Sequence, residues 1–421
     1  MKKLRFKSSL VLLFFVFFGC FQTAGAAAEK TLKVGITAPL TGHSALWGTN
    51  AKAAVKTAFN GIDNKIGDYR IEVVWIDSQS DPAKATNAFS EAVEKKGIDV
   101  AFYDVHSSVS VALMDVVSKY EIPLIFPLGA AGTINEKWLS DPDKFRFFGG
   151  KGWPEPGKLA NGYVEALEHS IANGSWTPPT KKVAIYGEQT DWGKSFCSQL
   201  KKSFENAGWE IFSEDYLPNT QTDHYPLLSK YKKGEVSVIA GTITGTSSMT
   251  GFIKQSAEIG LKAVIIADGL GWSGNWYSMT GQSSNYVLDM IPQLTTPEAK
   301  KWAEDIKKEY GFLPSPNAGG LVYDYANFFI KVANRVLEKH GNLDRASFQD
   351  VLVTEVNTGK ITYSKKDGAI IMQEYKYTPE SMPDPVVAQD YFYFPVIQYF
   401  KGKGQIVFPD QWKEQDMKFR K

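Results

Sequence analysis

The sequence lacks any excess of one charge, and this absence narrows the classes of protein to which the chain can belong. It has 47 basic and 46 acidic side chains in 421 residues, a net charge of +1. Nucleic-acid binding needs a clustered basic surplus that neutralises phosphates, so the balance argues against a nucleic-acid partner. Hydrophobic residues make up 43% and charged residues 22%, which is typical of a globular chain. The length predicts two or three domains.

Long apolar runs are also missing, except near the N-terminus. Residues 10–18 form an apolar run, small residues follow at 24–28, and four basic residues come first: Lys2, Lys3, Arg5 and Lys7. This order predicts a secretory signal peptide over residues 1–28. Its removal takes away four basic and no acidic side chains, so the net charge changes from +1 to −3. The run is too short to cross a bilayer, and no other stretch is long and apolar enough, so we expect a mature protein that does not span the membrane.

Cysteine is nearly absent. Cleavage after Ala28 leaves Cys197 as the one remaining cysteine, which excludes an internal disulfide in the mature chain. An alternative reading makes Cys20 a lipid-attachment site, because Gly19 precedes it at the end of the apolar run. The alanine-rich region beyond favours ordinary cleavage and release to the periplasm. Cys197 lies in a helical pattern and is expected to be a small packing residue.

Motifs for catalysis or metal binding are scarce. The chain has no His-x-x-x-His pair, no paired cysteine site, no Walker loop and no Gly-x-Ser-x-Gly elbow. Its five histidines are dispersed: His43, His106, His169, His224 and His340. We therefore expect a protein without enzymatic activity, metal or cofactor. The alternative is a dinucleotide-dependent enzyme, since residues 269–274 match Gly-x-Gly-x-x-Gly and Asp289 follows twenty residues after Gly269. The helix that must follow, residues 275–285, is short, polar and interrupted by Gly281.

Short β-branched runs alternate with longer amphipathic stretches along the rest of the chain, which is typical of parallel βαβ units. Strands are expected at residues 32–37, 71–77, 100–104, 123–127, 145–149, 183–187, 211–217, 236–241 and 264–268. Helices are expected at residues 48–62, 82–96, 107–120, 155–171, 192–207, 224–232, 248–259, 296–310 and 318–340. A hairpin is expected over residues 360–377, and a final pair of strands over 390–409. Two successive sets of such units predict an α/β protein with two doubly wound parallel-sheet lobes.

Polar residues follow several of the expected strands, at the edge where ligands bind in open α/β sheets. His106, Ser107 and Ser108 come after the strand 100–104 and open a helix, where hydroxyl and backbone N–H groups can bind a carboxylate. The alternative is that Ser107 only caps the helix. Asp268 ends another strand, and it can pair with a ligand ammonium or merely cap the next turn.

Tryptophans recur at the same kind of position. One indole follows each of four expected strands: Trp47, Trp153, Trp192 and Trp272. Any one of them alone is explained by packing. As a set they predict a clamp for an apolar, aromatic or cationic solute.

Motifs spread along the chain resemble a known family. The first are Leu32-Lys33-Val34-Gly35-Ile36, Pro39-Leu40-Thr41-Gly42 and Trp47-Gly48. Further matches follow in order: Asp77, Asp81-Pro82, Ala85, Ser107-Ser108, Ile122-Pro123-Leu124-Ile125, Phe145-Arg146, Trp192-Gly193, Glu258-Ile259-Gly260-Leu261-Lys262, Asp268-Gly269 and Tyr323-Asp324. In order and spacing they resemble the leucine/isoleucine/valine-binding protein family, the periplasmic solute receptors of ABC importers.

The resemblance implies a type I periplasmic binding protein, with two lobes joined by a three-segment hinge that closes on the solute. Residues 29–148 and 293–388 would form lobe 1, and residues 149–292 and 389–421 would form lobe 2. The ligand-binding residues it implies, together with the strand-end tryptophans, are Trp47, Ser107, Ser108, Leu128, Ala130, Trp153, Trp192, Thr244 and Asp268. Ser107 would bind the ligand carboxylate, and Asp268 would pair with its ammonium.

The sequence departs from the amino-acid-binding pattern of that family at several positions. Ala130 stands where a threonine hydroxyl is expected, and Thr242 and Thr244 lie on the loop beside the ammonium site. Ser80 and His106 lie near the places where some members have a disulfide. We therefore expect a monomeric binding protein for an amino acid, branched-chain or aromatic, or for a related small carboxylate, delivered to ABC permease subunits. A ligand-sensing receptor domain is the alternative role with the same fold.

Overall fold

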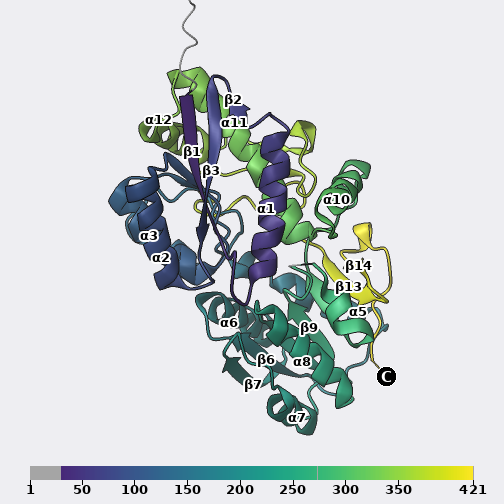
Figure 1. Ribbon diagram of the computed structural model, residues 1–421. Coiled ribbons are helices and arrows are strands. Elements are labelled where there is room, and N and C mark those ends of the chain that lie inside the picture. The colour runs from purple at the N-terminus through teal and green to yellow at the C-terminus, as the bar shows by residue number, and fades with distance from the viewer. Residues whose placement is uncertain (1–29, 273, 421) are drawn as a thin grey trace, which may run out of the picture.

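The computed structural model describes residues 30–272 and 274–420. The expected signal peptide and Cys20 lie outside these residues. Two lobes, each with a central sheet and flanking helices, make up the described chain (Figure 1).

The first lobe contains a five-stranded sheet with the order β2-β3-β1-β4-β5. Its strands are β1 (Lys30–Ala38), β2 (Lys65–Ile66), β3 (Tyr69–Asp77), β4 (Val100–Phe102) and β5 (Leu124–Ile125). All neighbours are parallel except β2, which pairs antiparallel to β3. Leu32, Val34 and Ile36 of β1 are completely buried, as expected for a central strand covered by helices on both faces.

Helices from two distant parts of the chain cover this sheet. They are α1 (Ala45–Asn60), α2 (Pro82–Glu91), α3 (Ser107–Tyr120), α4 (Gly132–Ser140), α10 (Pro297–Tyr310), α11 (Val322–His340) and α12 (Arg345–Val351). Helix α11 lies beside α1, and the rings of Phe59 and Phe329 are 6.1 Å apart at this contact (Figure 1). A small hairpin follows, with β11 (Tyr363–Ser364) antiparallel to β12 (Glu374–Tyr375), as expected for residues 360–377.

The second lobe contains a seven-stranded sheet with the order β14-β13-β10-β9-β8-β6-β7. Its strands are β6 (Lys182–Glu188), β7 (Glu210–Leu217), β8 (Val238–Thr242), β9 (Val264–Asp268), β10 (Leu288–Met290), β13 (Val396–Phe400) and β14 (Lys403–Phe408). Its helices are α5 (Asn161–Ala172), α6 (Asp191–Asn206), α7 (Tyr225–Lys233), α8 (Thr246–Glu258) and α9 (Trp276–Thr280). Strand β13 comes after the first-lobe hairpin β11–β12 in the chain, but it pairs with β10 of the second lobe. The chain therefore passes between the lobes three times: after β5, after β10 and after β12.

Most expected elements are found within a few residues, and the exceptions have local causes. Residues 145–149 do not form a strand, and Phe148 makes only a single bridge to Leu124; β5 itself is two residues long between Pro123 and Pro127, so it offers little edge to pair with. The helix expected over 155–171 begins only at Asn161, after a 3₁₀ turn at Pro156–Lys158. The three-residue strand β10 was not expected. No helix in the described part of the chain is long and apolar enough to cross a membrane.

Candidate functional site

A small cavity lies where the carboxyl ends of strands from both lobes meet. Its volume is about 30 Å³, room for one or two water molecules. The lining residues are Trp47, Val105, His106, Ser107, Leu128, Ala130, Trp153, Trp192, Thr244 and Trp272. They follow β1, β4 and β5 in the first lobe and β6, β8 and β9 in the second, and Trp153 belongs to the first connection between the lobes. Ligands bind at this edge in open α/β sheets.

Seven of the nine expected site residues line this cavity; Ser108 and Asp268 do not. The other lining residues are Val105, which was not expected, and His106 and Trp272, which were named after their strands but not included among the nine. The sequence did indicate a place for Trp272 at the site, because it is one of the four tryptophans that follow expected strands. His106 directly precedes Ser107, so its place beside the site follows from that of the serine.

Trp272 is the centre of the indole cluster, which comprises Trp47, Trp153, Trp192 and Trp272. Its ring centroid is 5.9 Å from that of Trp47, 5.2 Å from that of Trp153 and 5.3 Å from that of Trp192. The rings are steeply inclined to that of Trp272, with interplanar angles of 83°, 60° and 56° in the same order. All four side chains are at least nine-tenths buried. The tryptophans expected to form a clamp therefore do converge, at the interface between the lobes.

Ser107 connects the start of α3 to the loop that carries Ala130. Its Oγ accepts hydrogen bonds from the backbone N–H groups of Ala130 and Ala131, at 3.0 and 3.1 Å. With its acceptor positions used, the hydroxyl proton is free to point elsewhere. The first N–H groups of α3 have no acceptor within their own helix, and the helix dipole favours an anion there. This end of the cavity is therefore suited to a carboxylate.

His106 adds two more polar atoms to the same end. The ring is buried, and neither of its nitrogens has a hydrogen-bond partner among the described residues. Burial, aided by the nearby His43, lowers the pKa of His106 to about 3, so the ring is neutral at physiological pH. A neutral imidazole offers one donor and one acceptor to a ligand.

Asp268 lies behind the cavity wall instead of lining it. Its Oδ1 accepts a hydrogen bond from the Tyr163 hydroxyl at 2.6 Å, and its backbone oxygen accepts one from Thr242 Oγ1 at 2.8 Å. Burial and the charge of Asp289 raise the pKa of Asp268 well above its usual value. Thr242 Oγ1 in turn accepts the indole N–H of Trp192 at 2.9 Å, so this network orients one ring of the indole cluster.

Glu188, at the end of β6, is a second acid near the cavity, and both of its oxygens are occupied. It accepts hydrogen bonds from the N–H and hydroxyl of Thr244, at 2.6 and 2.7 Å, and from the hydroxyl of Thr190 at 2.7 Å. These bonds position Thr244, the lining residue from the second lobe that carries a hydroxyl.

A few polar contacts join the two lobes around the cavity. The N–H of Asp191 at the start of α6 donates to Ser108 Oγ at 3.3 Å. The N–H of Gly132 donates to Ser195 Oγ at 2.9 Å. Ser108 thus contacts the opposite lobe instead of the cavity, and the lobes are held together in a closed arrangement.

A buried ion pair supports the Ala130 loop from the hinge side. Lys151 Nζ lies 2.8 Å from Asp384 Oδ1, and both side chains are inaccessible to solvent. Lys151 follows the first lobe in the chain, and Asp384 belongs to the last connection between the lobes. The same ammonium donates to the carbonyl oxygen of Ala130 at 3.3 Å. Two hinge segments and one cavity loop therefore share one charge cluster.

The glycine-rich turn at residues 269–274 has a structural role that does not require a dinucleotide. Asp289 accepts the N–H groups of Gly269 and Gly271, at 3.1 and 2.8 Å, and the hydroxyl of Tyr399 at 2.6 Å. A Cβ on Gly271 would lie 2.2 Å from that hydroxyl, so close approach accounts for this glycine. Helix α9 has only five residues. The N–H groups that a phosphate would need are thus already used.

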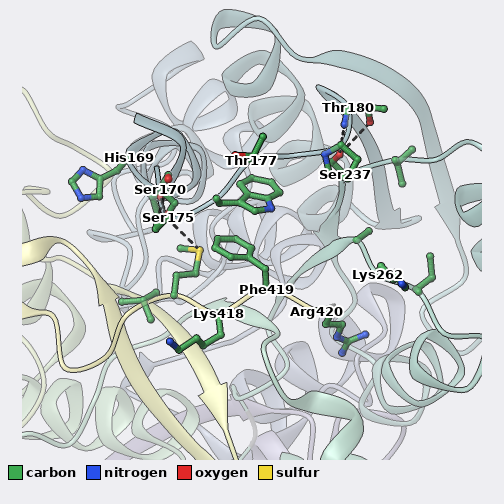
Figure 2. Close-up of a pocket in the computed structure, with 18 of the residues that line it drawn as sticks. His169, Ser170, Ser175, Thr177, Thr180, Ser237, Lys262, Lys418, Phe419 and Arg420 are labelled. Carbon is green, nitrogen blue, oxygen red and sulfur yellow. Dashed lines mark hydrogen bonds between the residues drawn. The ribbon is translucent and has the colours of Figure 1, made fainter. Parts of the chain in front are cut away.

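A larger hollow of about 1210 Å³ lies at the opposite edge of the second sheet (Figure 2). Thr180, Ser237 and Ala263 line it, and each lies just before a strand begins. Phe419 projects into it (Figure 2) and stacks on Trp176, with centroids 4.7 Å apart. None of the expected site residues line it, so its size does not make it the ligand site. Within the described residues no cluster of histidine, cysteine and acidic side chains could hold a metal ion.

Comparison with known proteins places this geometry in a family. The model of the periplasmic binding protein family matches residues 31–373. The Leu/Ile/Val-binding protein homolog 6 of Brucella suis is 24% identical over 300 residues, which cover 68% of this chain and 72% of that protein. A leucine-, isoleucine-, valine-, threonine-, and alanine-binding protein of Pseudomonas aeruginosa is 24% identical over 349 residues, 80% of this chain and 87% of that protein.

Solved structures share the fold. A branched-chain amino acid transporter substrate-binding protein of Streptococcus pneumoniae, in complex with isoleucine, superposes with a TM-score of 0.72 at 16% identity, covering 89% of this chain and 98% of that chain. A solute-binding protein of an ABC transporter from R. palustris, in complex with benzoate, gives a TM-score of 0.71 at 17% identity, covering 90% and 95%. The expected fold class is confirmed. With a family model that spans most of its length, the chain belongs to the periplasmic binding protein family.

Proposed function

We propose that the protein is the extracytoplasmic solute receptor of an ABC importer, and that it binds a small carboxylate between its two lobes. One observation carries the proposal: residues from both lobes line a single buried cavity around Trp272. A ligand held there contacts both lobes, so its binding energy favours the closed arrangement over the open one.

The relatives support this class of ligand. The P. aeruginosa protein is named for binding leucine, isoleucine, valine, threonine and alanine, and the R. palustris structure holds benzoate. All of these ligands are small and carry a carboxylate. The cavity has matching parts: carboxylate donors near Ser107 at one end and the indole cluster beside them.

The moving units are residues 29–148 with 293–388, and residues 149–292 with 389–421. The closed cavity has room for only one or two waters, so the units must separate to admit a ligand, and they close around it less far than in this structure. We propose that the closed, monomeric form docks on the permease subunits, and that residues 1–28 direct export to the periplasm. Cys20 as a lipid anchor remains the alternative, which the mass of the mature N-terminus distinguishes.

Thermal unfolding in the presence of candidate ligands tests the function, because a ligand that binds only the folded state raises the Tm. The purified mature chain is screened against isoleucine, phenylalanine, benzoate, glycine betaine and NAD. We expect at least one carboxylate to raise the Tm, and small-angle X-ray scattering to show a smaller radius of gyration with it. Stabilisation by NAD alone would contradict the proposal.

A further inference from the structure

We infer that the solute is a betaine, a zwitterion with a carboxylate and a permethylated ammonium, and that the indole cluster holds the ammonium by cation–π contacts. The inference rests on the proposed function and specifies its ligand. It follows from the shape of the cluster, the acceptors that the cavity lacks, and the donors near Ser107.

The shape of the indole cluster suits a compact, round group. Trp47, Trp153 and Trp192 are inclined to Trp272 by 56° to 83°, and their centroids are 5.2 to 5.9 Å from its own, so the rings touch in the closed form. Trp47 belongs to the first lobe and the other three to the second, so a small separation of the lobes opens a corner walled by these rings. A flat aromatic ligand would meet such inclined rings partly stacked and partly edge to face. A trimethylammonium group presents methyl groups in every direction, so it can meet the face of each differently inclined ring.

Surrounding side chains hold the cluster in place. Trp153 contacts Phe394 edge-on, with centroids 4.7 Å apart, and Trp192 lies 5.2 Å from Phe196. The N–H of Trp192 is bound to Thr242. Aromatic walls that are fixed before the ligand arrives lose little entropy on binding.

The cavity offers few acceptors to an ordinary ammonium. No carboxylate is among its described lining residues. Asp268 is not a lining residue, and its Oδ1 accepts from Tyr163. Both oxygens of Glu188 are used by Thr190 and Thr244. The polar side chains that do line the cavity are His106, Ser107 and Thr244. A primary ammonium has three N–H donors and would lose its hydration without replacement, whereas a permethylated one has none to satisfy.

The other half of the ligand finds donors at the start of α3. Ser107 has a free hydroxyl proton, and the first N–H groups of the helix have no helical acceptor. The ring nitrogens of His106 and the indole N–H of Trp272 have no partner among the described residues. A zwitterion brings no net charge into this buried space, which lowers the cost of desolvation relative to a free cation.

An isosteric pair of ligands tests the inference on the full mature chain. Glycine betaine and 3,3-dimethylbutanoate have the same shape and carboxylate, and differ only in nitrogen against carbon at the branch point. By titration calorimetry we expect glycine betaine to bind about tenfold more tightly or better, as a desolvated cation–π contact predicts. We also expect choline and glycine to bind at least tenfold more weakly than glycine betaine. Equal or tighter binding of 3,3-dimethylbutanoate, choline or glycine would overturn the inference, as would no binding of glycine betaine.

The two proposals fail differently. If isoleucine or benzoate binds and glycine betaine does not, the receptor function holds and the betaine assignment falls. If no carboxylate binds, both fall.

Conservative variants locate the contact. Trp153→Phe and Trp192→Phe keep an aromatic ring but weaken its attraction for a cation. Each should therefore weaken the binding of glycine betaine roughly three- to thirtyfold. The binding of 3,3-dimethylbutanoate should weaken less. Trp176→Phe, in the hollow at the far edge of the second sheet, is the matched control and should leave both affinities unchanged. The ratio of the two affinities is read within each folded variant, so a general loss of packing lowers both and leaves the ratio unchanged. An unchanged ratio in both folded cavity variants would overturn the cation–π contact.

Discussion

The hydroxyl of Tyr163 donates a 2.6 Å hydrogen bond to Oδ1 of Asp268, a residue 105 positions further along the chain. Both side chains are buried. The carboxyl group at the end of β9 is thereby held inside the second lobe, behind the cavity wall. Asp268 therefore has two alternative roles. It pairs with the ligand, or it anchors the indole cluster from inside the lobe through Thr242.

Substitution of Asp268 by asparagine distinguishes these roles. Asparagine keeps an oxygen for the Tyr163 hydroxyl, so we expect a folded protein whose affinity for glycine betaine changes less than about threefold, because no ionic contact to the ligand is lost. Titration calorimetry measures this affinity. If Asp268→Asn instead abolished binding of an amino acid that the wild type binds, with the Tm retained, Asp268 would be the ammonium partner that the family resemblance implies.

The ion pair between Lys151 and Asp384 should be costly to break from one side. Burial alone would raise the pKa of Asp384, but the charges of Lys151 and Lys158 outweigh burial and hold it below its usual value. Lys151→Met removes the buried one of two cations that lie 2.8 Å from the carboxylate and leaves the part-exposed Lys158. We expect a loss of up to about 3 kcal/mol in the free energy of unfolding, measured by urea denaturation.

Two further variants complete this test. Lys151→Met combined with Asp384→Leu should recover part of the loss, since the one charge left without this partner is that of Lys158, which is part-exposed to water. Lys301→Met breaks an exposed ion pair with Asp305 on α10 and should leave stability nearly unchanged. A cost for Lys151→Met as small as that for Lys301→Met would show that Lys158 alone, or water, satisfies Asp384.

Asp104, which follows β4, should make the protein less stable as the pH rises. Burial raises the pKa of this carboxyl to about 7, against the hydrogen bond that Ser110 Oγ donates to it at 2.6 Å. Since the unfolded group titrates near pH 4, the folded protein binds the extra proton between about pH 4 and pH 7. This proton therefore stabilises the folded protein fully below about pH 4, and the stabilisation is lost as the pH rises from about 4 to about 7.

The Asp104→Asn variant removes this titration. We expect thermal unfolding from pH 4 to pH 8 to show a smaller decline of stability in the variant than in the wild type. Ser110→Ala removes a hydrogen bond that favours the charged form, so it should move the decline to higher pH. Identical profiles for Asp104→Asn and the wild type would mean that the carboxyl is not protonated in the folded state.

The neighbouring serines Ser107 and Ser108 form a matched pair at the start of α3. Ser107→Ala leaves the N–H groups of Ala130 and Ala131 without their acceptor and removes a donor for the ligand. We expect about 1–3 kcal/mol lower stability and roughly tenfold weaker carboxylate binding. Ser108→Ala removes only the 3.3 Å contact to Asp191 and should change the affinity less than about threefold. Calorimetric titration of both variants provides the comparison, and equal losses would contradict a carboxylate role for Ser107.

Local patterns in the sequence were enough to predict most of the secondary structure and the place of the site. Periodicity and β-branched runs predicted the strands and helices of both lobes, and α3 was predicted at Ser107–Tyr120, the range it occupies. The four indoles were recognised by their common place after strands, because parallel strands bring their carboxyl ends to one edge. Most of the expected site residues line one cavity for the same reason.

Only the tertiary structure decided which of these residues face the ligand and which anchor one another. Tyr163 and Asp268 are 105 residues apart, and Lys151 and Asp384 lie in different connections between the lobes. No spacing along the chain reveals such pairs, since the energy of a buried charge depends on the groups that long-range packing brings to it. The sequence determined where the site lies and that aromatic rings surround it. The placement of Asp268 behind the wall, which leaves the cavity without an acid, came from packing alone.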